Sequence, residues 1–217
     1  MKSKRPKSSP KPAGKPIEAV GDAEEAAAPP RIIGGNFRGR RLIYTPHLRT
    51  RPMKDRVREA VFNLIGPSVQ GKHAIDLFAG TGALGFEALS RGAARATFVD
   101  RHFPTAELIR ENAAALGVER LATVLPANVL LWSRRLPPLP ADTAWLVFCS
   151  PPWNLYVEQS EAVLALLAKL LEHAPADSVF VVEAEKRFDL GRLPRSAEWE
   201  VREYPPAVVA ILETAGA

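Results

Sequence analysis

Residues 76–85 have the sequence Asp76-Leu-Phe-Ala-Gly80-Thr-Gly82-Ala-Leu-Gly85. An apolar, strand-like run at residues 73–77 leads into this segment, and a helical pattern at residues 83–91 follows it. Glycines at a strand-to-helix turn let the backbone approach a ligand closely, and the helix N-terminus supplies free N–H groups. The segment therefore predicts a ligand-binding loop at the end of the first strand of an α/β sheet.

The remainder of the chain alternates strand-like and helix-like runs. Further strands are expected at residues 96–100, 122–125, 144–149 and 179–183. Helices are expected at residues 55–66, 83–91, 105–116, 129–134 and 156–172. Alternation of this kind predicts a mostly parallel sheet with helices on both faces. Two final runs, residues 198–204 and 207–213, meet at Pro205-Pro206 and predict an antiparallel pair.

Composition limits the possible classes of protein. The chain has 217 residues, 47% of them hydrophobic and 24% charged, which suits one well-cored domain with an appendage. The single cysteine, Cys149, excludes a disulfide framework and a cysteine-based zinc cluster within one chain. His47, His73, His102 and His173 lack metal-ligand spacing, so we predict no metal. No apolar run is long enough for a signal peptide or a membrane span, which favours the cytoplasm.

The net charge of +5 is unevenly distributed along the chain. Residues 1–17 hold six basic side chains and no acid, whereas residues 18–30 hold four acids and no base. Residues 31–58 hold nine bases against Asp55, which leaves a net charge of −5 on residues 59–217. Solvated charges act over only about 10 Å at moderate salt, so the location of this charge matters more than its total. The basic N-terminal portion indicates an anionic partner.

This N-terminal portion divides into two parts. Residues 1–30 are rich in Lys, Pro, Ala and Ser and lack an apolar period, which predicts a disordered tail. Residues 31–44 resemble two short strands around a glycine-containing turn and predict a small basic hairpin, with the helix at residues 55–66 after it. We therefore expect a tail at 1–30, a docking hairpin and helix at 31–66, and a catalytic domain at 67–217.

The glycine loop fits two classes of cofactor. The spacing Gly80-x-Gly82-x-x-Gly85 matches the dinucleotide-binding fingerprint, and Asp100 ends the second strand where an acid can bind a ribose diol. A carboxylate at Asp76, expected to face the ligand from the strand end, would repel a pyrophosphate. The same charge would attract an ammonium or a sulfonium group. The pattern therefore favours S-adenosylmethionine over NAD.

A second motif, Ser150-Pro151-Pro152-Trp153, follows the fourth expected strand. In an open parallel sheet the strand C-termini line one crevice, so this loop and the glycine loop should share a site. Ser150 Oγ and the Pro151 carbonyl can accept the protons of an exocyclic amine, and Trp153 can stack on a base. These groups suit methylation of a nucleobase amine, with the rate supplied by positioning and transition-state electrostatics.

Four blocks of the chain carry a resemblance to known proteins. They are Arg31-Ile-Ile-Gly-Gly-Asn-Phe-Arg-Gly-Arg40, Arg51-Pro-Met-Lys-Asp-Arg-Val-Arg-Glu-Ala-Val-Phe-Asn63, Asp76-Leu-Phe-Ala-Gly-Thr-Gly-Ala-Leu-Gly-Phe-Glu-Ala-Leu-Ser-Arg-Gly92 and Ser150-Pro-Pro-Trp153. Together they resemble the class I methyltransferases and, more narrowly, the RsmD family of bacterial 16S rRNA guanine-N2 methyltransferases. The resemblance implies a Rossmann-like, seven-stranded, mostly parallel sheet with S-adenosyl-L-methionine as the methyl donor. It also implies one guanine of 16S rRNA, on an assembling small ribosomal subunit, as the substrate.

Carried over by position, the resemblance assigns roles to individual residues. The donor would be held by Asp76, Phe78, Ala79, Gly80, Thr81, Gly82, Asp100 and Arg101 and, at its adenine edge, by Asn128. RNA phosphates would be engaged by Arg31, Arg38, Arg40, Arg41, Arg49, Arg51 and Arg56. The catalytic residues would be Ser150, Pro151, Pro152 and Trp153. A monomer without membrane attachment is expected.

One residue departs from the family pattern. The catalytic loop of the family usually begins with Asp, whereas this chain has Ser150. Serine keeps an acceptor but loses the negative charge, and hydrogen bonds to charged groups contribute about 1.5–3 kcal/mol against about 0.5–1.5 kcal/mol for neutral ones. We therefore expect slower catalysis or compensation nearby. An adenine-N6 methyltransferase and a non-catalytic ribosome-assembly factor stay open as alternatives, and Glu183 fits a place near the site as well as a surface role.

Overall fold

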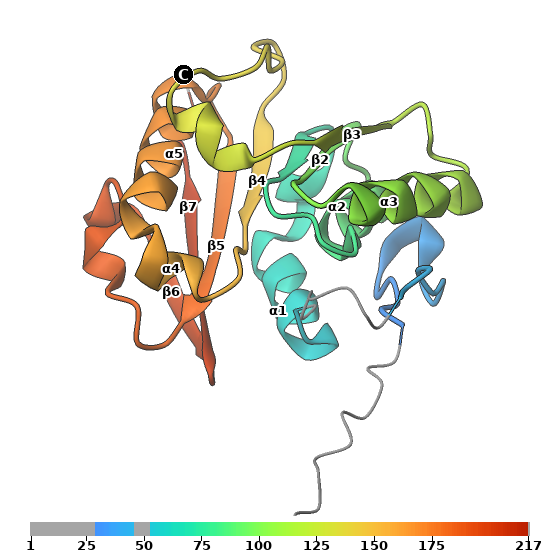
Figure 1. Ribbon diagram of the computed structural model, residues 1–217, viewed down its shortest axis with the longest axis horizontal. Coiled ribbons are helices and arrows are strands. Elements are labelled where there is room, and N and C mark those ends of the chain that lie inside the picture. The colour runs from blue at the N-terminus through green and yellow to red at the C-terminus, as the bar shows by residue number, and fades with distance from the viewer. Residues whose placement is uncertain (1–28, 46–52, 217) are drawn as a thin grey trace, which may run out of the picture.

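Seven strands form one sheet in the order β3-β2-β1-β4-β5-β7-β6 (Figure 1). The computed structural model describes residues 29–45 and 53–216. The strands are β1 His73–Asp76, β2 Arg95–Asp100, β3 Ala122–Pro126, β4 Trp145–Cys149, β5 Val179–Glu185, β6 Glu200–Tyr204 and β7 Ala207–Glu213. β1 to β5 run parallel, and β7 is antiparallel to both of its neighbours, β5 and β6.

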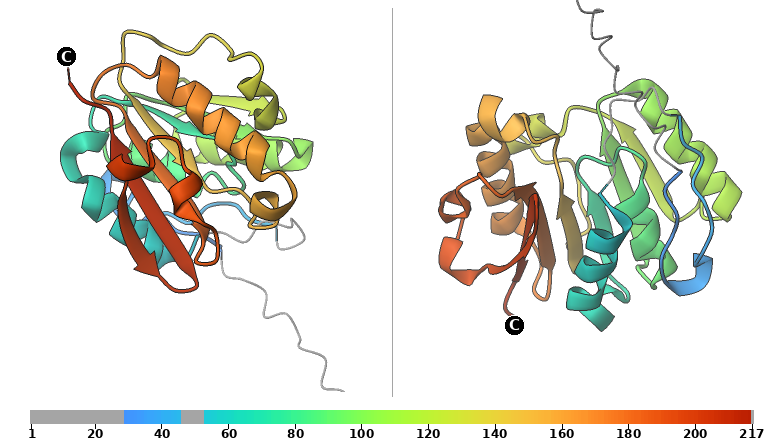
Figure 2. Two further views of the ribbon diagram at one scale, coloured as in Figure 1. Left: turned by 90° about the vertical axis from the view of Figure 1, so that its left-hand side faces the viewer. Right: turned by 90° about the horizontal axis from the view of Figure 1, so that it is seen from below.

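Helices cover both faces of this sheet (Figure 2). One face packs against α1 Asp55–Ile65, α2 Ala83–Ser90 and α3 Phe103–Leu116. The other face packs against α4 Leu155–Glu158, α5 Ser160–His173 and the short 3-10 helix η3 Val129–Ser133. β1 and β4 are buried along their whole length because both faces of the parallel sheet are covered. The expected Rossmann-like sheet with an antiparallel C-terminal pair is confirmed.

Two expected helices take a different form in the structure. The helix expected at residues 129–134 is the 3-10 helix η3, Val129–Ser133, because Asn128 Oδ1 accepts the Leu130 N–H at 3.1 Å and starts a tight turn there. The single helix expected at residues 156–172 is divided into α4 and α5, because Gln159 between them leaves the helical conformation with φ of −140°. Both differences arise from backbone conformation at a single residue, which apolar periodicity does not report.

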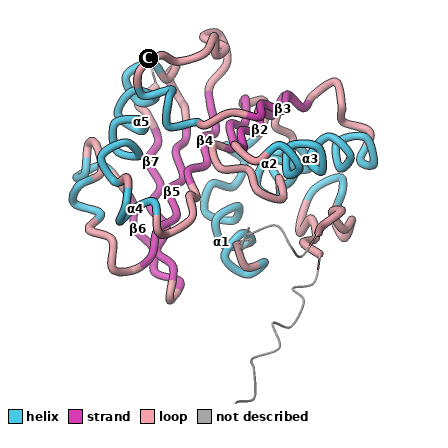
Figure 3. The backbone as a smooth tube through the Cα atoms, viewed as in Figure 1, coloured by secondary structure: helices cyan, strands magenta, loops and turns pink. Residues whose placement is uncertain are grey.

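The N-terminal hairpin is also looser than predicted (Figure 3). One β-bridge pairs Arg31 with Arg41, and a 3-10 turn, η1 Gly35–Phe37, lies between them. Two backbone hydrogen bonds flank the bridge, from the Ile32 N–H to the Arg40 carbonyl at 2.9 Å and from the Leu42 N–H to the Pro30 carbonyl at 2.8 Å. Beyond them the N–H groups of Ile33 and Gly34 donate to the side chain of a helical residue, at 2.7 and 2.8 Å. The segment at residues 29–45 therefore lies against α2 and is not a free-standing hairpin.

The helical residue that accepts these two hydrogen bonds is Glu87, in the middle of α2. Its side chain is fully buried and also accepts from Arg91 Nε at 2.7 Å. Arg58, in α1, is fully buried as well and donates to the Arg31 carbonyl at 2.5 Å and to Asp55 at 3.0 Å. Arg58 Nε lies 3.9 Å from Glu87, so one buried network joins the N-terminal segment, α1 and α2.

Close contact with α2 also depends on a glycine. Gly35 has φ of +73°, and a Cβ at this position would lie 1.9 Å from the Ser90 carbonyl oxygen. Any other residue would push the segment away from the helix.

One expectation lies largely outside this description. All but the last two residues of the expected disordered tail, 1–30, lie outside the described residues. Across residues 29–45 and 53–216, no helix combines the length and the apolar character needed to cross a lipid bilayer.

Candidate active site

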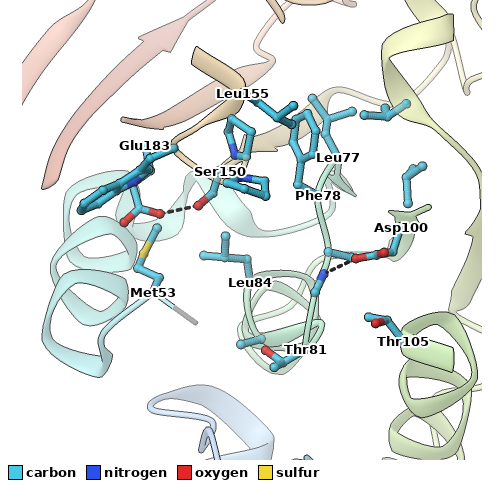
Figure 4. A pocket seen from close by; sticks show the side chains of 18 of the residues that line it. Met53, Leu77, Phe78, Thr81, Leu84, Asp100, Thr105, Ser150, Leu155 and Glu183 are labelled. Atoms are coloured by element: carbon cyan, nitrogen blue, oxygen red, sulfur yellow. Dashed lines mark hydrogen bonds between the residues drawn. The ribbon is translucent and has the colours of Figure 1, made fainter. Parts of the chain in front are cut away.

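A cavity of about 650 Å³ opens at the carboxyl ends of the parallel strands (Figure 4). We call one part the glycine-loop side; it takes lining residues from segments 77–84, 99–105 and 127–130. We call the other part the proline-loop side; it takes lining residues from segments 53–57, 150–155 and 204–207 and from Glu183. Figure 4 shows Asp100 and Thr105 on the first side and Ser150 and Glu183 on the second. The two loops therefore line one cavity, which is what the sheet topology predicts.

The glycine loop turns sharply between β1 and α2. Gly82 has φ of +75° and is the N-cap residue of α2, and a Cβ there would lie 2.7 Å from the Phe86 ring. A residue with a side chain would be strained by this backbone and would collide with the helix. The cavity is lined by Phe78, Ala79, Gly80 and Thr81. Gly82 is not a lining residue; it makes the turn from the loop into α2.

Asp76 does not face the cavity, contrary to the expectation from sequence. It is 1% exposed, and its Oδ2 accepts the Gly85 N–H at 3.2 Å beneath α2. Side chains alternate along a strand, and Asp76 shares the face of Ala74, which belongs to the core under α1 to α3. Its Oδ1 is buried without a hydrogen-bond partner among the described residues. Burial raises the pKa of Asp76 to about 7.

Asp100 occupies the end of β2 and does line the cavity. Its Oδ2 accepts the Gly80 N–H at 2.9 Å, and its Oδ1 accepts the His102 N–H at 2.8 Å. A carboxylate has about four lone-pair sites, so Asp100 can hold the glycine loop and still accept further hydrogen bonds. Arg101 and Asn128 line the same part of the cavity.

The proline loop follows β4 and leads directly into α4. The Pro152 carbonyl accepts the Leu155 N–H at 2.8 Å, and the Trp153 carbonyl accepts the Tyr156 N–H at 3.1 Å. These bonds occupy the last two carbonyl oxygens of the loop. Among the described residues, the Pro151 carbonyl oxygen accepts no hydrogen bond, so it is available to a ligand. All four residues of the loop, 150–153, line the cavity.

Glu183 is the cavity residue whose place the sequence left undecided. It stands in the apolar strand β5, is 8% exposed, and lines the cavity beside the proline loop. Ser150 Oγ donates a hydrogen bond to its Oε2. Burial raises the pKa of Glu183, and the hydrogen bond from Ser150 opposes that shift. The available signal was a charged residue directly after the apolar run 179–182, but sequence alone did not tell to which face of the strand its side chain points.

Known proteins resemble this chain along most of its length. The family described as Conserved hypothetical protein 95 matches residues 30–205. Ribosomal RNA small subunit methyltransferase D of Haemophilus influenzae is 33% identical over 157 residues, which cover 72% of this chain and 79% of that protein. The protein of the same name from Escherichia coli is 45% identical over 100 residues, or 46% of this chain and 50% of that one. This chain belongs to the RsmD family.

A solved structure agrees with this membership in the RsmD family. The Escherichia coli protein yhhF has a TM-score of 0.69 and 28% sequence identity, and the likeness covers 86% of this chain and 98% of that one. The family and the class I methyltransferase fold that the sequence motifs predict are both confirmed.

The basic residues expected to contact RNA are divided in this RsmD-family chain between surface and cavity. Arg31, Arg38, Arg40 and Arg41 are exposed on the N-terminal segment, although Arg31 is also paired with Asp55 at 2.9 Å. Arg56 lines the cavity, and its Nη2 lies 3.5 Å from the Pro205 carbonyl oxygen. Arg49 and Arg51 lie outside the described residues.

Proposed function

We propose that this protein transfers a methyl group from S-adenosylmethionine to the exocyclic N2 amine of a guanine in 16S rRNA. One observation carries the proposal: the glycine loop and the proline loop line a single cavity in a chain of the RsmD family. The names of the two relatives add the small ribosomal subunit as the source of the RNA. We place the reaction in the cytoplasm, on an assembling subunit, with the protein acting as a monomer.

The glycine-loop side fits the donor chemically. Asp100 keeps free lone pairs for a ribose diol, and the exposed Asn128, whose Oδ1 caps η3, keeps its amide NH₂ for an adenine edge. The buried carboxyl of Asp76 lies beneath this loop and accepts the Gly85 N–H at 3.2 Å, which holds the start of α2 against β1. When bound, S-adenosylmethionine supplies an electrophilic methyl group on a sulfonium.

The proline-loop side fits the acceptor amine. Ser150 Oγ has donated its hydrogen to Glu183, so its lone pairs can accept one proton of the amine, and the Pro151 carbonyl can accept the other. Holding both protons draws the nitrogen lone pair away from the aromatic ring and aims it into the cavity. Trp153 lines the cavity and can stack on the base. These residues act by positioning and electrostatics rather than through a covalent intermediate.

The direct test uses purified protein and immature small subunits from a strain that lacks the gene. Tritiated methyl groups from S-adenosylmethionine should appear in 16S rRNA as N2-methylguanine, and the rRNA of the deletion strain should lack that nucleotide at one position. Label found as N6-methyladenine would favour the adenine alternative. Donor binding without label in any RNA would support a non-catalytic assembly factor.

The proposed RNA-docking surface consists of Arg38, Arg40 and Arg41 on the N-terminal segment. Replacing all three with Ala should weaken RNA binding and reduce the slope of log affinity against log salt by roughly two, since each phosphate contact contributes about 0.7–0.9. The matched control replaces Arg187, Arg192 and Arg202, three exposed arginines of the C-terminal portion, with Ala. Equal slopes for the two triple variants would remove these arginines from the RNA footprint.

A further inference from the structure

The proline loop begins with a neutral side chain, yet a carboxylate lies directly against it. Glu183 is the fifth residue of β5, and its Oε2 accepts the hydrogen bond of Ser150 Oγ (Figure 4). Both residues line the cavity, so their unshared oxygen lone pairs can reach a molecule inside it. Ser150 and Glu183 together form a hydroxyl–carboxylate pair in the cavity wall.

The backbone of Glu183 is held in place, and its side chain keeps an acceptor without a partner among the described residues. Tyr156, in α4, donates its hydroxyl hydrogen to the Glu183 carbonyl oxygen at 2.9 Å, and β5 is paired with β4 on one side and β7 on the other. Within residues 29–45 and 53–216, Oε1 accepts no hydrogen bond, and no cation lies at ion-pair distance from the carboxylate. Among the described residues, Oε1 is therefore the acceptor of the pair that is left without a partner.

A free carboxylate beside an amine-binding hydroxyl distinguishes the nucleobases. An ionised carboxylate only accepts hydrogen bonds. Guanine presents two adjacent donors, N1–H and the N2 amine, on its Watson–Crick edge. Adenine and cytosine each present an amine beside an unprotonated ring nitrogen, which would face the carboxylate with a lone pair. The Ser150–Glu183 pair therefore complements the two donors of guanine. It would repel the ring-nitrogen lone pair of adenine or cytosine.

We propose that Glu183 selects the target base: it accepts N1–H of guanine through Oε1 while its Oε2 orients Ser150 toward the N2 amine. The inference rests on the proposed function and deepens it, because it names the residue that separates guanine from adenine. It also explains how the cavity keeps a negative charge where Ser150 replaces the Asp usual in the family. Glu183 supplies that charge from a neighbouring strand.

The experiment compares two substrates and two proteins. Small subunits are reconstituted with rRNA that carries either guanine or 2-aminopurine at the target position; 2-aminopurine keeps the amine but has no hydrogen on N1. The wild-type protein should prefer guanine by about 10- to 100-fold in kcat/KM, the discrimination typical of a paired hydrogen-bond contact to a base. Glu183→Gln should bring that preference close to one, because an amide can offer either its oxygen or its NH₂ to N1.

Two controls separate base selection from folding. Glu185→Gln makes the same change two residues along β5, at a carboxylate that pairs with Arg187 on the surface, and it should keep the wild-type preference. Glu183→Gln should also bind S-adenosylhomocysteine with an unchanged Kd in calorimetry, since the glycine-loop side is untouched.

Two results would overturn the inference while leaving the proposed function in place. If Glu183→Gln lowers kcat/KM on both substrates by the same factor, Glu183 only positions the loop and does not select the base. If the wild-type protein methylates guanine and 2-aminopurine equally, N1–H is not recognised. Failure of the wild-type protein to methylate either substrate would overturn the proposed function itself, and the inference with it.

Discussion

The two sides of the cavity are assembled in different ways. The glycine-loop side is built around one continuous stretch, residues 77–84, supported by the ends of the next two strands. The proline-loop side brings together the start of α1, the loop after β4, Glu183 in β5 and the turn between β6 and β7. Arg56 and Pro205, which meet there, are 149 residues apart in the sequence. A local motif can thus specify the glycine-loop side, the proposed donor site, whereas the proline-loop side depends on long-range packing.

The largest expected effect comes from breaking the network that supports the start of α1. Glu87→Gln removes the buried charge that pairs with Arg91 at 2.7 Å and lies 3.9 Å from Arg58, and it removes an acceptor from the N-terminal segment. Loss of one partner of a buried ion pair costs about 3–5 kcal/mol, and we expect a loss of stability of that size in urea unfolding.

The matched control for this variant is Glu107→Gln. Glu107 pairs with Arg110 on the exposed face of α3, where such a pair contributes at most about 1 kcal/mol. Similar unfolding midpoints for the two variants would show that the Glu87 network does not hold α1 and the N-terminal segment in place.

Asp100→Ala tests the glycine-loop side. The change removes the acceptor of the Gly80 N–H and the proposed contact to the ribose diol. Hydrogen bonds to charged groups contribute about 1.5–3 kcal/mol each, so Kd for S-adenosylhomocysteine should rise about 100-fold in calorimetry. Asp142→Ala, at an exposed loop carboxylate, should leave Kd unchanged. An unchanged Kd for Asp100→Ala would remove Asp100 from the donor site.

Trp153→Ala is the counterpart on the proline-loop side. Stacking of a base on an aromatic ring contributes about 1–3 kcal/mol, so kcat/KM for the RNA substrate should fall about 10-fold or more. Kd for S-adenosylhomocysteine should stay within about twofold of the wild-type value. Equal losses of turnover and donor affinity would mean that the two sides of the cavity do not act separately.

The smallest expected effect is a pH dependence of stability that arises from Asp76. Burial raises its pKa in the folded protein to about 7, so between its ordinary pKa and about 7 the folded state binds a proton that the unfolded state has released. Stability must therefore fall as pH rises through this range, by about 1 kcal/mol between pH 6 and pH 7 for this group. Asp76→Asn should flatten the slope in urea unfolding at these two pH values. A slope that is the same in both proteins would mean that Asp76 is ionised in the folded state well below pH 7.

Much of the fold follows from short-range patterns. The alternation of runs predicts all seven strands and their direction, and the glycine spacing predicts the loop after β1. The hairpin at residues 31–44 is formed only in part, with one bridge between Arg31 and Arg41. Glu87, more than fifty residues away, accepts the N–H groups of Ile33 and Gly34 and so holds the segment against α2 through charge-assisted hydrogen bonds that local patterns do not report.

In the candidate site, too, short-range patterns do not decide how two carboxylates are oriented. Both Asp76 and Glu183 stand near the carboxyl end of a parallel strand, and the sequence suggested that Asp76 faces the ligand and left Glu183 undecided. The structure places Asp76 beneath α2 and Glu183 in the cavity wall. No motif distinguishes them, because each orientation depends on which helix covers that face of the strand.

The sequence by itself determined the sheet, the glycine and proline loops, the family and the basic N-terminal portion. Apolar periodicity, glycine backbone conformation and charge are properties of neighbouring residues, so they can be read along the chain. Only the tertiary structure decided that Ser150 meets Glu183 and that Asp76 turns away from the cavity. The first outcome depends on the pairing of β4 with β5, which brings together residues 33 apart in the sequence, and the second on the packing of α2 over the end of β1.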